Sequence, residues 1–83
     1  MENRIRDILG KFGRLPVAIE QIKPNDDLYD AGLSSLATVN VMLAIEDAFD
    51  LEFPDQLLTR RSFQSIASLT GVVMGLKSSA VVP

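Results

Sequence analysis

The chain of 83 residues contains no cysteine and no histidine, and its aromatic residues are limited to four phenylalanines and one tyrosine. The absence of cysteine excludes disulfide bonds and thiolate metal sites. The absence of histidine also removes the commonest general base, most transition-metal ligands and any Ser-His-Asp triad. We therefore predict that this chain is not an enzyme and holds no metal ion.

Long apolar segments are also missing from the sequence. No run of apolar residues is long enough to span a membrane. The first residues lead directly into an amphipathic pattern and lack the apolar core of a signal peptide. We expect a cytoplasmic protein with no membrane partner, and its length suits one domain whose 47% hydrophobic content supplies the core.

Basic residues are absent from the middle of the chain. From Pro24 to Thr59 there is no lysine or arginine but there are eight acidic residues, so this segment carries −8 and the flanks carry +5 of the net charge of −3. Such a segment would repel a nucleic acid duplex, and we exclude nucleic acid as a partner. The asymmetry favours a protein partner with a basic patch, although an ordinary solvated acidic face has the same charge pattern.

Hydrophobic periodicity predicts an all-α fold that starts with a helix from residue 2 to about 14, weakened by Gly10 and Gly13 and ended at the latest by Pro16. A long connection over residues 16–34 follows, and a connection of this length needs side chains that pin it to the core. Residues 17–22 can form a short helical turn within it. The candidate pins are Val17, Ile19, Ile22, Leu28 and Leu33.

A second helix is predicted from residue 35 to about 50, because Pro54 pushes the residue before it out of the helical region. A short third helix is expected over residues 54–60. Its side chains Leu57 and Leu58 are expected to point inward.

Ser62 is a plausible N-cap for a fourth helix, which the apolar pattern extends from residue 63 to about 75. The remaining residues, 77–83, are small or β-branched and show no helical period. We expect them to form a disordered tail, so that residues 1–76 make up the single domain.

The helix over residues 35–50 carries two apolar stripes instead of one. One stripe consists of Val41, Met42, Ile45 and Phe49, with Thr38 beside them. The nearly opposite stripe consists of Leu36, Val39 and Leu43, with acidic residues around it. A second stripe of this kind indicates a surface that partners contact. The alternative is a central helix that is buried on all sides.

Two serines stand where this helix begins. Ser34 or Ser35 is expected to accept a hydrogen bond from a first-turn amide, and Gly32 suits a backbone conformation that a β-carbon disfavours. The positive end of a helix favours an anion by about 0.3–1 kcal/mol. A phosphodiester on Ser35 would therefore lie in a favourable field, with the stripe of Leu36 beside it.

These landmarks resemble those of the acyl carrier protein and peptidyl carrier protein family. The resemblance rests on Gly32-Leu33-Ser34-Ser35-Leu36, Glu46-Asp47-Ala48-Phe49, Pro54-Asp55 and the closing helix from Ser62 to Leu69. It implies a four-helix bundle with one short helix. It also implies that a phosphopantetheinyl transferase attaches 4′-phosphopantetheine to Ser35, and that the thiol of this arm carries a cargo as a thioester.

The resemblance further implies which residues face the enzymes that visit the arm, including a ligase that adenylates and loads the cargo and downstream acyl-transfer enzymes. These residues are Leu36, Val39, Asn40, Leu43 and Asp47. No metal-binding or catalytic residue is implied.

Three departures from the family pattern bear on the cargo. Ser34 stands where the family has an aspartate, Asn40 where fatty-acid carriers commonly have glutamate, and Arg60 and Arg61 add positive charge near the third helix. They favour a specialised monomeric carrier of an aminoacyl or small acyl group over the housekeeping fatty-acid carrier. The alternative is an unmodified helical bundle that acts only as a protein-interaction module.

Overall fold

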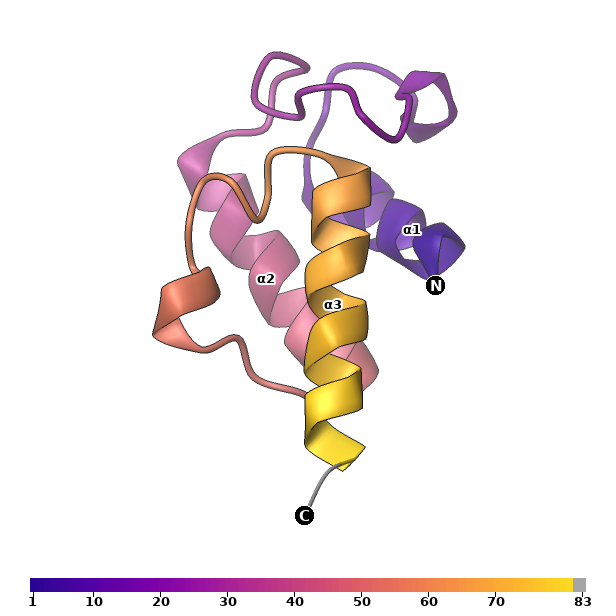
Figure 1. The fold of residues 1–83 in the computed structure, drawn as a ribbon. Helices are drawn as coiled ribbons and strands as arrows, with labels where there is room; N and C mark the ends of the chain where they lie inside the picture. Colours follow the sequence, from indigo (N-terminus) through magenta and orange to yellow (C-terminus); the bar gives the residue numbers. More distant parts are fainter. Residues whose placement is uncertain (82–83) are drawn as a thin grey trace.

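The computed structural model describes the backbone of residues 1–81 and the side chains of residues 1–77. Within this range the chain is all-α and has no strand. Its elements are α1 (Glu2–Phe12), the 3-10 turn η1 (Ile19–Gln21), α2 (Ser35–Phe49), the 3-10 turn η2 (Asp55–Leu57) and α3 (Ile66–Val81) (Figure 1). The expected bundle is confirmed, with the short third helix reduced to η2.

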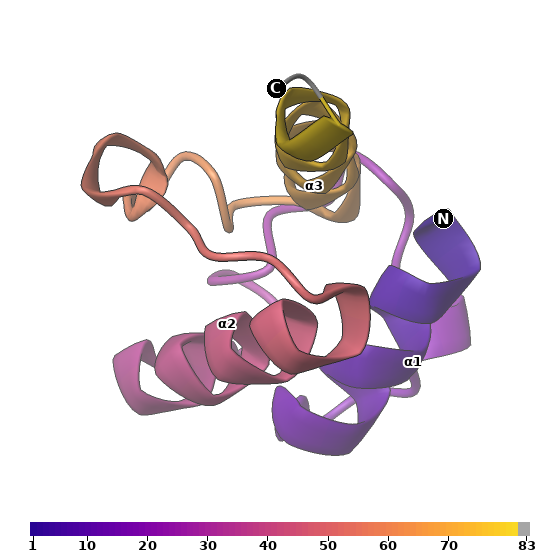
Figure 2. The same cartoon turned by 90° about the horizontal axis from the view of Figure 1, so that it is seen from below.

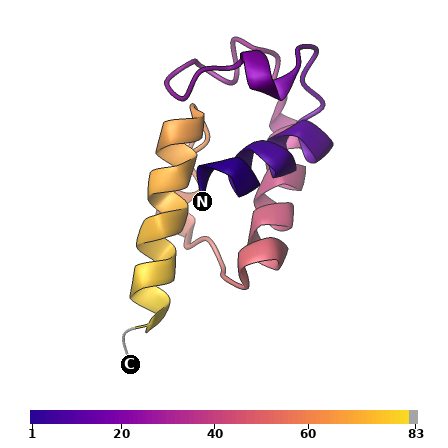
Figure 3. The same ribbon diagram turned by 90° about the vertical axis from the view of Figure 1, so that its right-hand side faces the viewer.

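Helix α1 is the element that joins the other two. It packs against both α2 and α3, and Figure 3 shows it lying across the space between them. Seen from below, α3 is viewed nearly end-on, while α2 and α1 lie across the view (Figure 2). The connection over residues 13–34 crosses the end of the bundle where α2 begins, and the segment with η2 runs along one side (Figure 1).

The core is built from side chains spaced three or four residues apart on each helix, as the periodicity predicts. Helix α1 contributes Ile5, Ile8 and Leu9, α2 contributes Ala37, Val41, Ile45 and Phe49, and α3 contributes Ile66, Leu69 and Val73. Phe53 and Phe63, which lie on either side of η2 in the sequence, join this core with their rings stacked at 5.4 Å between centroids.

The long connection is pinned by both side chains and hydrogen bonds. Of the predicted pins, Ile22, Leu28 and Leu33 are buried, Ile19 is half-buried, and Val17 is exposed, so the prediction was wrong for Val17. Arg6 of α1 donates to the carbonyl oxygens of residues 19 and 22 at 3.0 and 2.8 Å, which fastens η1 to the first helix.

Gly32 takes the conformation expected of it. Its φ is +117°, and a β-carbon there would lie 2.6 Å from Cδ of Pro16. Only glycine adopts this backbone region without strain. The close approach therefore packs Pro16, near the start of the connection, against Gly32, just before α2 begins.

The segment before α3 departs from expectation. The last helix begins at Ile66 and not at Phe63, and its cap is Ser65, whose Oγ accepts from the backbone N–H of Ser68 at 3.0 Å. Residues 59–64 form successive turns, in which the N–H of Ser62 bonds to the carbonyl oxygen of Thr59 at 3.2 Å. These turns bury Phe63 before the helix begins.

Two further expectations differ from the structure. Leu58 was expected to point inward but is 43% exposed at the residue that ends η2. Helix α3 runs to Val81, past the predicted end near residue 75. Residues 77–81 of the predicted tail are therefore helical, while residues 82–83 lie outside the described part of the chain.

The end of α2 that is remote from Ser35 is held by cations from both other helices. Arg4 of α1 places its guanidinium 4.5 Å from the ring centre of Phe49 and donates to the carbonyl oxygen of Ala48 at 3.1 Å. The Nζ atom of Lys77 on α3 lies 5.7 Å from the same ring centre. Cations are favourable at a helix C-terminus and over an aromatic face.

Among the described residues, none of the helices combines the length and the apolar character that a membrane span requires.

Candidate functional site

Ser34 and Ser35 divide the roles that the sequence left open. Ser34 is the N-cap of α2, and its Oγ accepts from the backbone N–H of Ala37 at 3.0 Å. Ser35 is the first residue of the helix and is exposed. Because Ser34 performs the capping, the Ser35 hydroxyl stands at the positive end of α2 without that structural duty.

The second apolar stripe of α2 faces solvent, and the alternative of a fully enclosed helix was wrong. Leu36 is 74% exposed, Leu43 is 54% exposed and Val39 is 47% exposed. Asn40 and Asp47 are exposed on the same helix. A contiguous apolar surface beside Ser35 is the property expected of a docking face, and the assignment of these five residues to partner contacts stays a prediction.

The two neighbouring acids of α2 do different things. Oε2 of Glu46 accepts from the backbone N–H of Phe53 at 2.8 Å, so this carboxylate holds the chain that leaves the helix. Asp47 is exposed. Of the pair, Asp47 is therefore the one available to a partner.

Asp27 organises the turn that leads to the serines. Its Oδ1 accepts from the backbone N–H groups of Tyr29 and Asp30 at 2.8 and 3.2 Å, and its Oδ2 accepts from the side chain of Gln64 at 3.1 Å. The Gln64 hydrogen bond is the largest cause that lowers the pKa of Asp27 below its usual value. Burial, the next largest cause, opposes it by raising the pKa, while the two backbone bonds and the charge of Arg60 each lower the pKa further.

We expect Asp27 to make the fold acid-sensitive. Because its pKa is lower in the folded chain, the stability it contributes is present above the unfolded pKa of about 3.9 and is lost as pH falls through the folded value. Asp27→Asn should therefore lower the midpoint of urea unfolding at pH 7, and this deficit should shrink below about pH 4. Asp30→Asn is the matched control and should show no such convergence. A deficit for Asp27→Asn that is the same at pH 7 and pH 3 would contradict the assignment.

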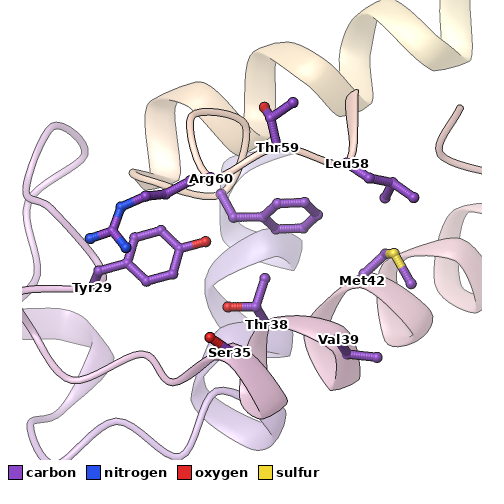
Figure 4. Close-up of a pocket in the computed structure, with 9 residues that line it drawn as sticks. Tyr29, Ser35, Thr38, Val39, Met42, Leu58, Thr59 and Arg60 are labelled. Carbon is purple, nitrogen blue, oxygen red and sulfur yellow. The ribbon is translucent and has the colours of Figure 1, made fainter. Parts of the chain in front are cut away.

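A hollow of about 360 Å³ opens beside Ser35, between the first half of α2 and the turns that precede α3. It is lined by Tyr29, Ser35, Thr38, Val39, Met42, Leu58, Thr59, Arg60 and Phe63. Figure 4 shows Ser35 and Thr38 at one side of the hollow and Met42 and Leu58 at the other. The walls are therefore apolar, with hydroxyl groups near Ser35.

Arg60 lies over Tyr29 at one edge of the hollow. Its guanidinium carbon is 4.2 Å from the centre of the Tyr29 ring, and Figure 4 shows the Tyr29 hydroxyl directed toward the middle of the group. The interpretation of the sequence placed Arg60 near the third helix but did not bring it to Ser35. No local pattern carries this information, because Arg60 lies in the turns before α3 and Ser35 lies at the start of α2.

Comparison with known proteins gives a consistent result. The profile of the family described as "Phosphopantetheine attachment site" matches residues 3–73. The aminoacyl carrier protein of Agrobacterium fabrum is 55% identical over 73 residues, which cover 88% of this chain and 88% of that protein.

Two solved structures are similar in fold as well as in sequence. One is the crystal structure of an engineered Bradyrhizobium japonicum glycine:[carrier protein] ligase complexed with carrier protein from Agrobacterium tumefaciens and AMP. The match has a TM-score of 0.87 and 54% identity, and covers 89% of this chain and 99% of that chain. The other is the Bradyrhizobium japonicum ligase complexed with glycylated carrier protein, with a TM-score of 0.75, 31% identity and coverage of 86% and 95%.

Proposed function

We propose, since this chain belongs to the phosphopantetheine-attachment family of carrier proteins, that it carries an aminoacyl group as a thioester on a 4′-phosphopantetheine arm attached to Ser35. The arm supplies the thiol that the chain itself lacks. In this function the carrier domain spans residues 1–76, acts as a monomer and performs no reaction of its own. Its place is the cytoplasm, where the ATP that an adenylating ligase consumes is found.

The observation that carries this proposal is the position of Ser35. Its hydroxyl is exposed at the first residue of α2, while Ser34 beside it is engaged as the cap. A phosphodiester at that atom gains from the first-turn amides and the helix dipole, by about 0.3–1 kcal/mol. A bulky arm can leave Ser35 without disturbing the core.

The surroundings of Ser35 fit the 4′-phosphopantetheine arm. Ser35 itself lines the hollow, so an arm rooted there has a neighbouring surface to lie on. The methyl groups of such an arm match the apolar wall at Met42 and Phe63, and its amides match the hydroxyl groups of Tyr29 and Thr38. No residue would have to move for the arm to start from this position.

The amino acid cargo is supported by the relatives. The Agrobacterium fabrum protein is an aminoacyl carrier protein, and the two solved complexes pair carriers with a glycine:[carrier protein] ligase. We therefore expect this chain to receive glycine or another small amino acid from an adenylating ligase, after a phosphopantetheinyl transferase has installed the arm. Downstream acyl-transfer enzymes would then take the amino acid.

The proposed function can be tested directly by intact-mass spectrometry of the protein. Coexpression with a promiscuous phosphopantetheinyl transferase should add the mass of one phosphopantetheine group. The modified protein, incubated with glycine, ATP and a glycine:[carrier protein] ligase, should then gain the mass of one glycyl group, which hydroxylamine should release. Absence of the first gain with every transferase tried would overturn the proposal and favour an unmodified protein-interaction module.

The docking face of α2 gives a further expectation. Leu36→Ala should lower the kcat/KM of the charging ligase for the modified carrier by about 30-fold, the size of a central interface residue worth about 2 kcal/mol. Met74→Ala is the matched control, because Met74 is 54% exposed on α3. It should leave kcat/KM unchanged. Equal effects of the two variants, with equal melting temperatures, would contradict the assignment of Leu36 to the partner surface.

A further inference from the structure

Arg60 is an oriented cation that has no carboxylate in contact with it. Its guanidinium carbon lies 4.2 Å from the centre of the Tyr29 ring, a stacking that restricts the direction of this long side chain. Within the part of the chain that the structure describes, the only salt bridge joins Arg6 to Glu2. The fold therefore directs the charge of Arg60 without pairing it.

Asp27 is an acid that senses the charge of Arg60, but it serves another purpose. The charge of Arg60 lowers the pKa of Asp27 less than each of the hydrogen bonds that Asp27 accepts. Its two carboxylate oxygens accept from the side chain of Gln64 and from the backbone N–H groups of Tyr29 and Asp30. Asp27 thus holds its own turn together, and the guanidinium of Arg60 remains available to another anion.

Ser35 would bring such an anion to the same place once it carries the arm. Ser35 and Arg60 both line the hollow of about 360 Å³, and Arg60 is the only charged residue among the nine described ones that do so. The first turn of α2 contains no acidic residue, and Ser34 is neutral where the family has an aspartate. No carboxylate of this turn therefore competes with a phosphodiester for the guanidinium. Phosphate oxygens are among the strongest hydrogen-bond acceptors for an arginine.

We propose that Arg60 is the counter-ion of the phosphodiester on Ser35 and fixes the root of the arm against the turns that precede α3. This inference rests on the proposed function, because it requires the arm on Ser35. Arg60 is a positioning residue in this role, since it acts on the phosphate and not on the cargo. The pair joins residues 59–64 to the start of α2, so that an enzyme in contact with both segments meets a different surface in the modified chain.

Thermal unfolding of the modified and unmodified forms tests this pairing. Modification should raise the melting temperature of the wild type by about 3 °C more than that of Arg60→Gln, the size expected for one exposed ion pair in a small domain. The first-turn amides of α2 stabilise the phosphodiester in both proteins, so their contribution cancels in the difference. Arg61→Gln is the matched control, because Arg61 is exposed, does not line the hollow and loses the same charge. It should keep the gain of the wild type.

The Nε–H group of Arg60 gives a second readout, by ¹⁵N nuclear magnetic resonance. Its proton should move downfield and exchange more slowly with water after modification, while the signal of Arg61 should stay in place. In about 1 M NaCl the difference in melting temperature should shrink, because salt screens exposed charges.

Two results would overturn the inference while leaving the arm on Ser35. One is an equal gain in melting temperature for the wild type and Arg60→Gln, and the other is an Arg60 signal that modification does not change. Intact mass distinguishes these results from failure of the proposed function, in which no arm would be attached at all.

Discussion

A Ser35→Ala variant is expected to show no mass gain when it is coexpressed with a phosphopantetheinyl transferase, whereas the wild-type chain is converted completely. The physical reason is that the phosphodiester needs a hydroxyl at that position, and Ser35 is exposed at the first residue of α2. The expected effect is the loss of all modification, because no partial substitute for the oxygen atom remains.

The adjacent serine supplies the control for this experiment. Ser34→Ala removes the oxygen that accepts from the N–H of Ala37, which should cost about 1 kcal/mol of stability. It should nevertheless acquire the full mass gain. The two variants separate the attachment of the arm from the capping of the helix. A gain retained in Ser35→Ala and lost in Ser34→Ala would show that the roles of the two serines are exchanged.

Leu28→Ala should be the most destabilising of the simple truncations in the long connection. Leu28 is fully buried, its N–H donates to the carbonyl oxygen of Gln64 at 2.7 Å, and its carbonyl oxygen accepts from the N–H of Leu33 at 3.0 Å. Truncation of a buried leucine leaves a cavity and costs about 2–5 kcal/mol. This is a large part of the 5–15 kcal/mol that stabilises a typical domain.

The measurement is urea unfolding followed by circular dichroism. Leu43→Ala is the matched control, because the same atoms are removed from a side chain that is 54% exposed, and its stability should change by no more than about 0.5 kcal/mol. A cost below about 1 kcal/mol for Leu28→Ala would mean that the connection is not held by this side chain.

The arrangement of α2 follows from the sequence with little help from the rest of the fold. The spacing of Val41, Ile45 and Phe49 predicts the buried face, and Leu36 with Leu43 predicts the exposed one. Both succeed because side-chain direction in a helix repeats every 3.6 residues, so that burial of one face fixes the direction of the other. The buried residue that the predicted stripe omitted is Ala37, which is small enough to be overlooked as part of an apolar stripe.

The start of α3 shows where such reasoning fails. Ser62 and Ser65 both precede apolar residues, and either is an acceptable cap by composition. The choice is made by distant contacts. The N–H of Ala67 donates to the carbonyl oxygen of Pro24 at 2.9 Å, and the carbonyl oxygen of Gln64 is taken by Leu28. These two hydrogen bonds hold residues 64–67 against the long connection. The carbonyl oxygen of Gln64 is thereby engaged outside the helix, and α3 begins at Ile66.

The hollow beside Ser35 is beyond prediction from sequence for the same reason. Tyr29 and Arg60 are brought together by two connections that have no periodic pattern, and their stacking is known only once both are placed. The proposed attachment residue, Ser35, is easier to identify, because it forms a local motif with Gly32 and Leu36. The chemistry of the site is thus readable in the sequence, while the surface that the arm meets is not.

The cations that meet on Phe49 have a practical consequence for handling this protein. Arg4 and Lys77 bring the start of α1 and the later part of α3 to the end of α2 that is remote from Ser35 (Figure 1). A bead, an affinity tag or a neighbouring module joined at Met1 or to the side chain of Lys77 would therefore stand on the far side from Ser35, the proposed attachment residue. An immobilised or fused carrier should remain as easy to load as the isolated chain.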